Sequence, residues 1–78
     1  VMLMIVPLNS LKPGERGIVV NLQGGPGFRN RLLGMGITPG AVVQVIEVYN
    51  PGPLIISVSG TRFAIGRGMA SRIIVRKL

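Results

Sequence analysis

Residues 37–49, ITPGAVVQVIEVY, join a proline–glycine turn to the longest run of strand-forming residues in the chain. The polar residues of this run, Gln44 and Glu47, occupy positions of opposite parity, so a straight strand would point them to opposite faces. We expect a bend or β-bulge between them, which lets both reach solvent. Such a strand can pass from one side of a small β-barrel to the other, and the run therefore favours a barrel.

The rest of the chain repeats this pattern of short apolar runs separated by turns. Its 12 Gly and 6 Pro fall between the runs. Residues 12–15 (KPGE) have the composition of a β-turn, and residues 59–60 (SG) that of a hairpin turn. We expect Ile18, Val20 and Leu22 to share one face of the first strand. The pattern predicts an all-β fold, a small five-stranded barrel with strands over residues 16–22, 41–49, 54–58, 61–65 and 72–77.

One stretch departs from the strand pattern. Residues 27–35, GFRNRLLGM, place Phe28, Leu32 and Met35 at i, i+4 and i+7, which forms one stripe of a short α-helix after the first strand. Gly36 follows where a left-handed C-terminal cap is expected. Because a helix this short is not stable alone, its stripe should pack on the sheet.

The other side of this helix carries Arg29 and Leu33. An apolar residue beside an arginine on a small exposed helix is typical of a surface that docks into a partner's groove. Alternatively, Leu33 packs under the loop of residues 50–53. The two interpretations differ in whether Leu33 is left for a partner.

The length of 78 residues is that of a single domain. Residues 1–6, VMLMIV, are apolar but much shorter than the roughly 20 residues of a membrane-spanning helix, and they lack the charged start and longer apolar run of a secretory signal. We expect residues 1–6 to form a flexible or edge-pairing arm that could mediate self-association. Residues 7–78 should form the barrel domain.

The chain is poor in the side chains that perform chemistry. It has no Cys, no His and no Asp, and its only carboxylate side chains are Glu15 and Glu47. Catalytic triads, Cys–His pairs, disulfides and thiolate metal sites are therefore excluded. Residues 23–27 (QGGPG) lack the spacing of a phosphate-binding loop. We expect no enzyme activity, no cofactor, no metal site and no small-molecule substrate, and the lack of Cys fits the cytoplasm.

The charge is strongly positive, because nine Lys and Arg stand against two Glu to give a formal net charge of +7. Such an excess attracts nucleic acid, anionic lipid or an acidic protein face, or simply keeps the domain soluble. Barrels that bind RNA combine basic residues with stacking aromatic residues. Here Phe28, Tyr49 and Phe63 are the only aromatic residues, so nucleic-acid binding by a small basic barrel is an alternative that rests on charge alone.

Two segments resemble the FeoA family. Residues 11–17, LKPGERG, look like the opening of its members, and residues 28–40, FRNRLLGMGITPG, are similar to a motif of the form R-x-R-L-x-x-M-G-I/L-x-P-G. The similarity extends from about Pro7 to Leu78. It implies an SH3-like barrel, and a cytoplasmic accessory role in bacterial ferrous iron uptake through protein–protein contact with the membrane transporter FeoB. Membrane contact would then occur only through the transporter.

The same resemblance implies a set of partner-binding residues. We expect the docking face to include Arg29 and Leu33 as contact residues, with Leu32 and Met35 supporting the helix from below. Arg31 completes the motif. A metal-sensing regulatory domain is a further alternative.

Overall fold

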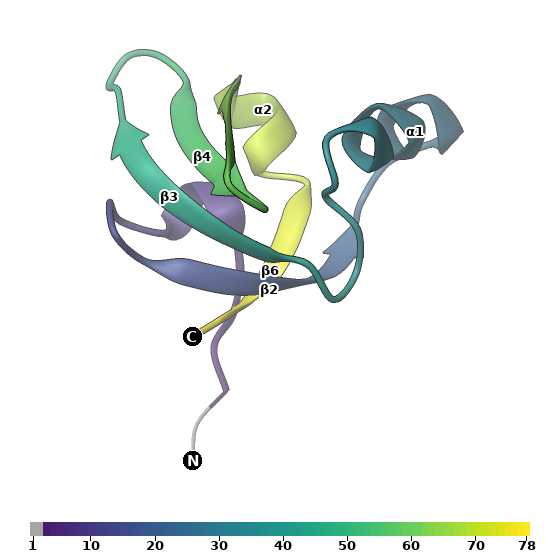
Figure 1. Ribbon diagram of the computed structural model, residues 1–78, viewed down its shortest axis with the longest axis horizontal. Coiled ribbons are helices and arrows are strands. Elements are labelled where there is room, and N and C mark those ends of the chain that lie inside the picture. The colour runs from purple at the N-terminus through teal and green to yellow at the C-terminus, as the bar shows by residue number, and fades with distance from the viewer. Residues whose placement is uncertain (1–2) are drawn as a thin grey trace.

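A single sheet of six antiparallel strands curls around the hydrophobic core in the computed structural model, which describes residues 3–78 (Figure 1). The strand order is β1-β6-β2-β3-β4-β5. The elements are β1 (Ile5–Pro7), the 3₁₀ helix η1 (Leu8–Ser10), β2 (Arg16–Leu22), α1 (Pro26–Gly34), β3 (Val42–Val48), β4 (Leu54–Val58), β5 (Thr61–Ile65), α2 (Arg67–Ala70) and β6 (Ile73–Lys77). No helix among residues 3–78 is both long and apolar enough to cross a membrane.

The fold class predicted from the sequence is confirmed, and the strand count is six where five were expected. The additional strand is β1, which pairs with β6 through Ile5 opposite Arg76 and Pro7 opposite Ile74. A three-residue strand shows no measurable alternation, so its sequence did not reveal it. Val1 and Met2 of the expected arm lie outside the described residues, and the division at residue 7 stays a prediction.

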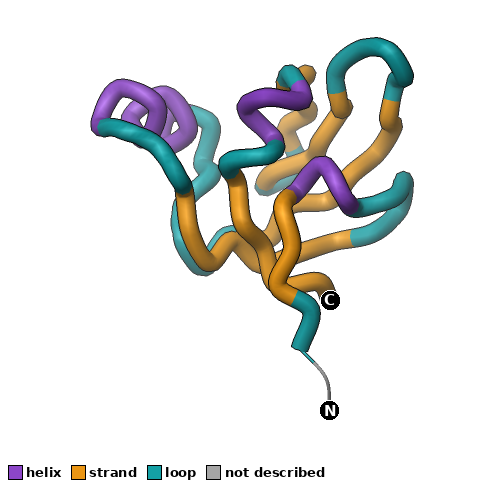
Figure 2. Tube along the Cα trace, turned by 180° about the vertical axis from the view of Figure 1, so that it is seen from behind, coloured by secondary structure: helices purple, strands orange, loops and turns teal. Residues whose placement is uncertain are grey.

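The two edges of the sheet, β1 and β5, are not joined by a backbone ladder within residues 3–78. Instead, α2, which follows β5, lies against η1, which follows β1. Leu8 of η1 and Ala70 of α2 are both fully buried. The barrel is therefore curled and open, and packing between these two short elements covers the core where the strands do not meet (Figure 2).

Both long strands contain a bulge. In β3 the register against β4 shifts between Val45 and Glu47, which confirms the irregularity predicted there. In β2 the register against β6 shifts between Val19 and Asn21. The expectation that Val20 shares one face with Leu22 is therefore wrong, because the bulge changes the parity: Val19 and Leu22 are buried and Val20 is 42% exposed.

Two proline–glycine turns of the same geometry precede the two long strands. In residues 12–15 and 38–41 the fourth residue donates its N–H to the carbonyl of the first, over 3.0 and 2.9 Å respectively. The third residue is glycine with positive φ, +90° at Gly14 and +94° at Gly40, a conformation that L side chains disfavour.

Each turn is also bonded to the strand that the other turn introduces. Gly14 donates its N–H to the carbonyl of Val45 in β3, and Gly40 donates to the carbonyl of Val19 in β2, both over 2.7 Å. Val45 and Val19 donate back to the turns that contact them, over 2.9 and 2.8 Å. The two turns are thus structurally equivalent, and each meets the opposite strand at the start of its bulge.

Candidate docking site at helix α1

The ends of α1 are defined by residues with restricted or unusual backbone. Pro26 occupies the first turn, where its missing N–H is not needed. At the other end Gly36 has φ of +81° and donates its N–H to the carbonyl of Leu33, while Ile37 donates to Leu32 over 2.9 Å. This is a Schellman cap, and it confirms the predicted role of Gly36. The cap turns the chain directly into the second proline–glycine turn.

The inner side of α1 matches the stripe predicted from its periodicity. Leu32 is fully buried, and Phe28 and Met35 are partly buried against the core. The guanidinium carbon of Arg72 lies 5.8 Å from the centre of the Phe28 ring. These contacts hold a helix that would not be stable on its own.

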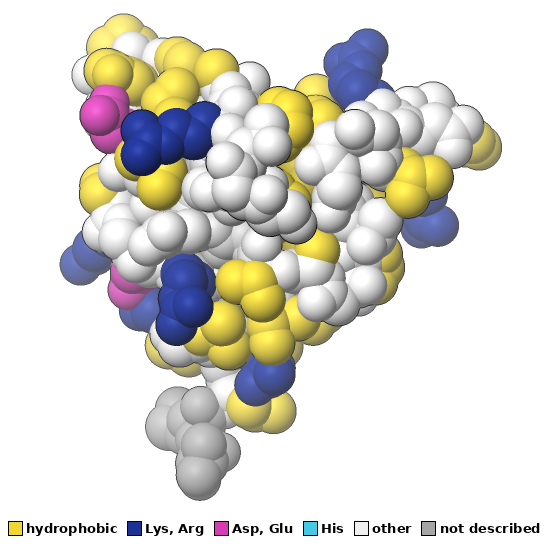
Figure 3. Space-filling view, in the orientation of Figure 1, with side chains coloured by type: hydrophobic (Ala, Val, Ile, Leu, Met, Phe, Trp, Pro, Cys, Tyr) yellow, Lys and Arg dark blue, Asp and Glu magenta, His cyan; other side chains and the backbone are white. Residues whose placement is uncertain are grey.

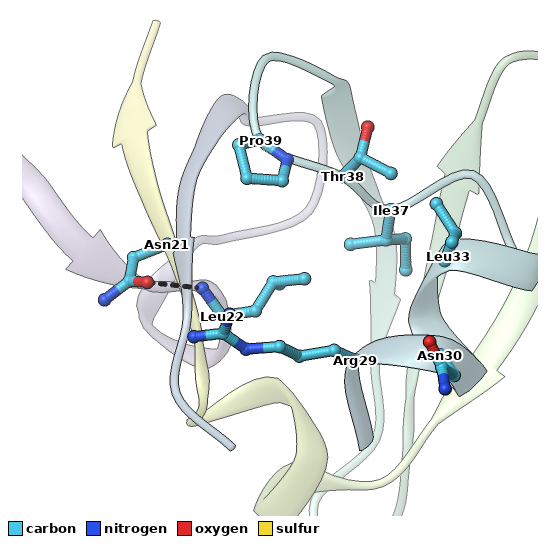
Figure 4. A pocket seen from close by; sticks show the side chains of 8 residues that line it. All are labelled: Asn21, Leu22, Arg29, Asn30, Leu33, Ile37, Thr38 and Pro39. Atoms are coloured by element: carbon cyan, nitrogen blue, oxygen red, sulfur yellow. Dashed lines mark hydrogen bonds between the residues drawn. The ribbon is translucent and has the colours of Figure 1, made fainter. Parts of the chain in front are cut away.

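A hollow of about 200 Å³ lies between α1, the end of β2 and the chain that leaves the helix. The buried side chains of Leu22 and Ile37 line its apolar part. Figure 4 shows the lining side chains: Asn21, Leu22, Arg29, Asn30, Leu33, Ile37, Thr38 and Pro39. The hollow is thus formed by three separate segments of the chain.

Arg29 and Leu33 are the two α1 side chains that the sequence singled out, and both line this hollow. Arg29 donates from Nε to the carbonyl of Gly24 over 3.2 Å, and its guanidinium extends towards Leu22 (Figure 4). In the described part of the chain its terminal N–H groups have no protein acceptor. Positive charge and apolar surface therefore lie next to each other.

Leu33 is 58% exposed, so the alternative in which it packs under the loop of residues 50–53 is wrong. The β3–β4 connection and α1 lie at opposite sides of the molecule (Figure 1). The reason is topological, because β3 leads away from the helix before the loop forms. Leu33 stands instead on the same side of the hollow as Ile37 (Figure 4).

The remaining motif residues occupy other positions. Leu32 lies beneath the helix in the core, Met35 packs at its margin, and Arg31 is exposed and does not line the hollow. The structure therefore brings together Arg29 and Leu33, with Leu32 below them. Sequence reasoning missed Asn21 and Thr38, because only the tertiary fold brings the end of β2 beside the chain that follows α1.

The two carboxylates lie away from this hollow. Glu15 forms an ion pair with Lys77, with Oε2 and Nζ 2.5 Å apart, and its Oε1 accepts the backbone N–H of Lys12 over 2.7 Å. The hydrogen bond from Lys77 and then that from Lys12 lower the pKa of Glu15. Glu47 accepts the hydroxyl of Tyr49 over 2.5 Å, and this hydrogen bond raises the pKa of Tyr49. Within residues 3–78 no cluster of three or more His, Cys, Asp or Glu is present.

The chain thus forms an SH3-like barrel with a helix and a proline–glycine turn after its first long strand. Residues 6–77 match the model of the FeoA domain family. The chain belongs to the FeoA family. It is 46% identical over 69 residues to a protein of Methanocaldococcus jannaschii provisionally named Fe(2+) transport protein A, which covers 88% of this chain and 83% of that relative.

Solved structures give the same result. A crystal structure of an iron uptake regulatory protein, FeoA, is 57% identical, with a TM-score of 0.92 over 96% of this chain and 100% of that one. FeoA of Stenotrophomonas maltophilia, determined with zinc and described as a prokaryotic SH3-domain protein, is 25% identical. Its TM-score is 0.75 over 96% of this chain and 89% of that one. The predicted family and SH3-like fold are confirmed.

Proposed function

We propose that this protein is a non-catalytic accessory factor of ferrous iron uptake, which acts in the cytoplasm by binding the membrane transporter FeoB. Membership of the FeoA family and the Fe(2+) transport name of its relative support the pathway. The chain has few side chains that can take part in catalysis, since it has no His, Cys or Asp. Its action is therefore assigned to contact with a partner.

The observation that carries this proposal is the pairing of Leu33 with Arg29 beside the hollow of α1. Leu33 exposes 58% of its surface, and covering apolar surface of this kind favours association. Arg29 lines the same hollow, and its guanidinium can bind a carboxylate of a partner. We infer that the transporter presents an apolar side chain next to an acidic one.

The test is a pull-down from native membranes with a tagged copy of the protein. Wild type should retain the transporter, and the Arg29→Gln/Leu33→Ser variant should retain about tenfold less, because it loses both the apolar and the charged contact. Arg62→Gln, on the exposed face of β5, is the control for loss of one positive charge.

Ferrous iron uptake gives the second measurement. Cells that lack the protein should take up less iron in low-iron medium, and wild type but not the double variant should restore uptake. Equal capture of the transporter by both proteins, or uptake that does not change on deletion, contradicts the proposal.

A further inference from the structure

The outer face of the sheet, opposite the core, carries a row of side chains that crosses four strands. Ile5 of β1 lies opposite Arg76 of β6, Arg76 lies opposite Ile18 of β2, and Ile18 lies opposite Val42 of β3. Residues directly opposite in an antiparallel sheet point to the same face. The row faces outward, because the adjacent positions along these strands are buried or packed against the core: Val6, Val75, Val19 and Val43.

The two ends of this row are exposed, and Ile18 and Arg76 between them are half-buried. Ile5 is 52%, Val42 44% and the bulge residue Val20 42% exposed. In the chain that leads into β1, Leu3 has the same parity as Ile5 and is 65% exposed. Lys77 donates its N–H to the carbonyl of Met4 over 2.9 Å, which holds this segment beside β6. We call the following residues the outer face: Leu3, Ile5, Ile18, Val20 and Val42, with the basic residues Arg16 and Arg76.

The charge of the outer face is positive. Arg76 stands between Ile5 and Ile18, and Arg16 lies on the same face of β2 as Ile18. Neither carboxylate side chain is available to them: Glu15 is paired with Lys77, and Glu47 lies beyond the bulge of β3. Figure 3 shows hydrophobic side chains gathered with Lys and Arg side chains at the lower end of the molecule, where Figure 1 places β2 and β6.

This charge pattern distinguishes between binding partners. Two copies of the chain meeting through this face would bring their arginines together without a carboxylate to compensate, which opposes self-association. The complementary surface is negative and accepts several aliphatic side chains at once. The outer face is the convex side of the curled sheet and includes none of the residues that line the hollow at α1. A lipid bilayer is a negative surface of this kind, because its headgroups can move aside and let a convex group of aliphatic side chains enter.

We propose that the outer face binds the surface of an anionic lipid bilayer. Ile5, Val20 and Val42 would lie at the boundary between headgroups and acyl chains, and Arg16 and Arg76 would contact lipid phosphates. This goes beyond the proposed function, because it gives the protein a membrane contact of its own in addition to contact through the transporter. This membrane contact does not depend on the transporter, and it can be tested with vesicles that contain no transporter.

The experiment is co-sedimentation of the full chain with protein-free vesicles, one set of pure phosphatidylcholine and one with roughly 30% phosphatidylglycerol. Wild type should sediment with the anionic vesicles and not with the neutral ones. Arg76→Gln should lower the partition coefficient about fivefold, from the loss of one basic residue near an anionic surface. Ile5→Thr/Val42→Thr should lower it about tenfold, because both residues stay β-branched but lose apolar burial.

Arg62→Gln is the charge-matched control, since it removes one positive charge from β5 outside the outer face. As a further control, thermal unfolding of each variant should show a cooperative transition, which establishes that the variant is folded. Equal partitioning of Arg62→Gln and Arg76→Gln, or full binding by the threonine variant, would overturn the proposal. Absence of vesicle binding combined with loss of iron uptake in the outer-face variants would also overturn it, in favour of an acidic protein surface.

Discussion

Gly17 is a residue at which the close packing of two neighbouring strands leaves little room for a side chain. A Cβ atom there would lie 2.7 Å from Cγ2 and 2.8 Å from Cβ of Val75, on the neighbouring strand β6. Val75 is fully buried and cannot move without disturbing the core. We predict that Gly17→Ala lowers the free energy of unfolding by about 1–3 kcal/mol, measured by urea denaturation.

Gly68 provides the matched control. A Cβ atom at this position in α2 meets no heavy atom within 4 Å, and alanine favours helix more than glycine does. Gly68→Ala should therefore leave stability unchanged or raise it by up to about 1 kcal/mol. Similar losses from both substitutions would show that crowding by Val75 is not the cause.

Glu15 makes stability depend on pH. Its pKa is lowered in the folded state from an ordinary value of 4.5 by the hydrogen bonds from Lys77 and Lys12. A group with a depressed folded pKa stabilises the protein above its unfolded pKa, and this contribution is lost as the pH falls through the folded pKa. We predict that wild type loses more stability between pH 7 and about pH 3 than Glu15→Gln does, measured by urea denaturation.

Lys77→Gln tests the cause of this shift, because Lys77 is the first contributor to it. Its pH dependence should approach that of Glu15→Gln, and the double variant should differ little from either single one. If the losses of stability from Glu15→Gln and Lys77→Gln are additive, Lys77 is not the cause of the lowered pKa of Glu15.

At the scale of the element, two adjacent leucines of α1 lie in different environments, one in the core and one at the surface. Leu32 is fully buried, whereas Leu33 is 58% exposed. We predict that Leu32→Ala lowers the free energy of unfolding by about 2–5 kcal/mol, because it leaves a cavity in the core. Leu33→Ala should change it by at most about 0.5 kcal/mol. Thermal or urea unfolding measures both, and a comparable loss from Leu33→Ala would mean that its side chain belongs to the core.

The strands show which parts of the fold the sequence could and could not predict. The alternation of Leu54, Ile56 and Val58 predicted β4 with its bounds and inner face, because one side of that strand is buried throughout. The bulge of β3 was predicted because Gln44 and Glu47 need solvent. The bulge of β2 was not, because apolar Val20 gave no sign that it would face outward.

The candidate site was predictable only in part. Helical periodicity placed Arg29 and Leu33 together on one side of α1, and both line the hollow. The opposite wall comes from Asn21 and from Thr38, which belong to other segments. No local pattern brings these segments together, because their proximity depends on the packing of Leu32 and Ile37 in the core.

At the scale of the whole molecule, positive charge is in large excess. Nine basic side chains face two carboxylates, and Glu15–Lys77 is the one ion pair within residues 3–78. Repulsion among like charges opposes the compact state and is screened by salt. We predict that the midpoint of urea unfolding rises between about 0.01 M and about 0.15 M NaCl. A midpoint that falls would show that attraction within the ion pair outweighs the repulsion.

The reciprocal bonding of the two proline–glycine turns also has a consequence for how the protein opens. Each turn holds the strand that follows the other turn, so neither corner can separate without freeing both strands. The region from residue 12 to residue 45 should therefore open as one cooperative unit. In deuterium exchange, the amides of Gly14, Val19, Gly40 and Val45 should share a common opening free energy, and clearly different values would mean that the two corners open independently.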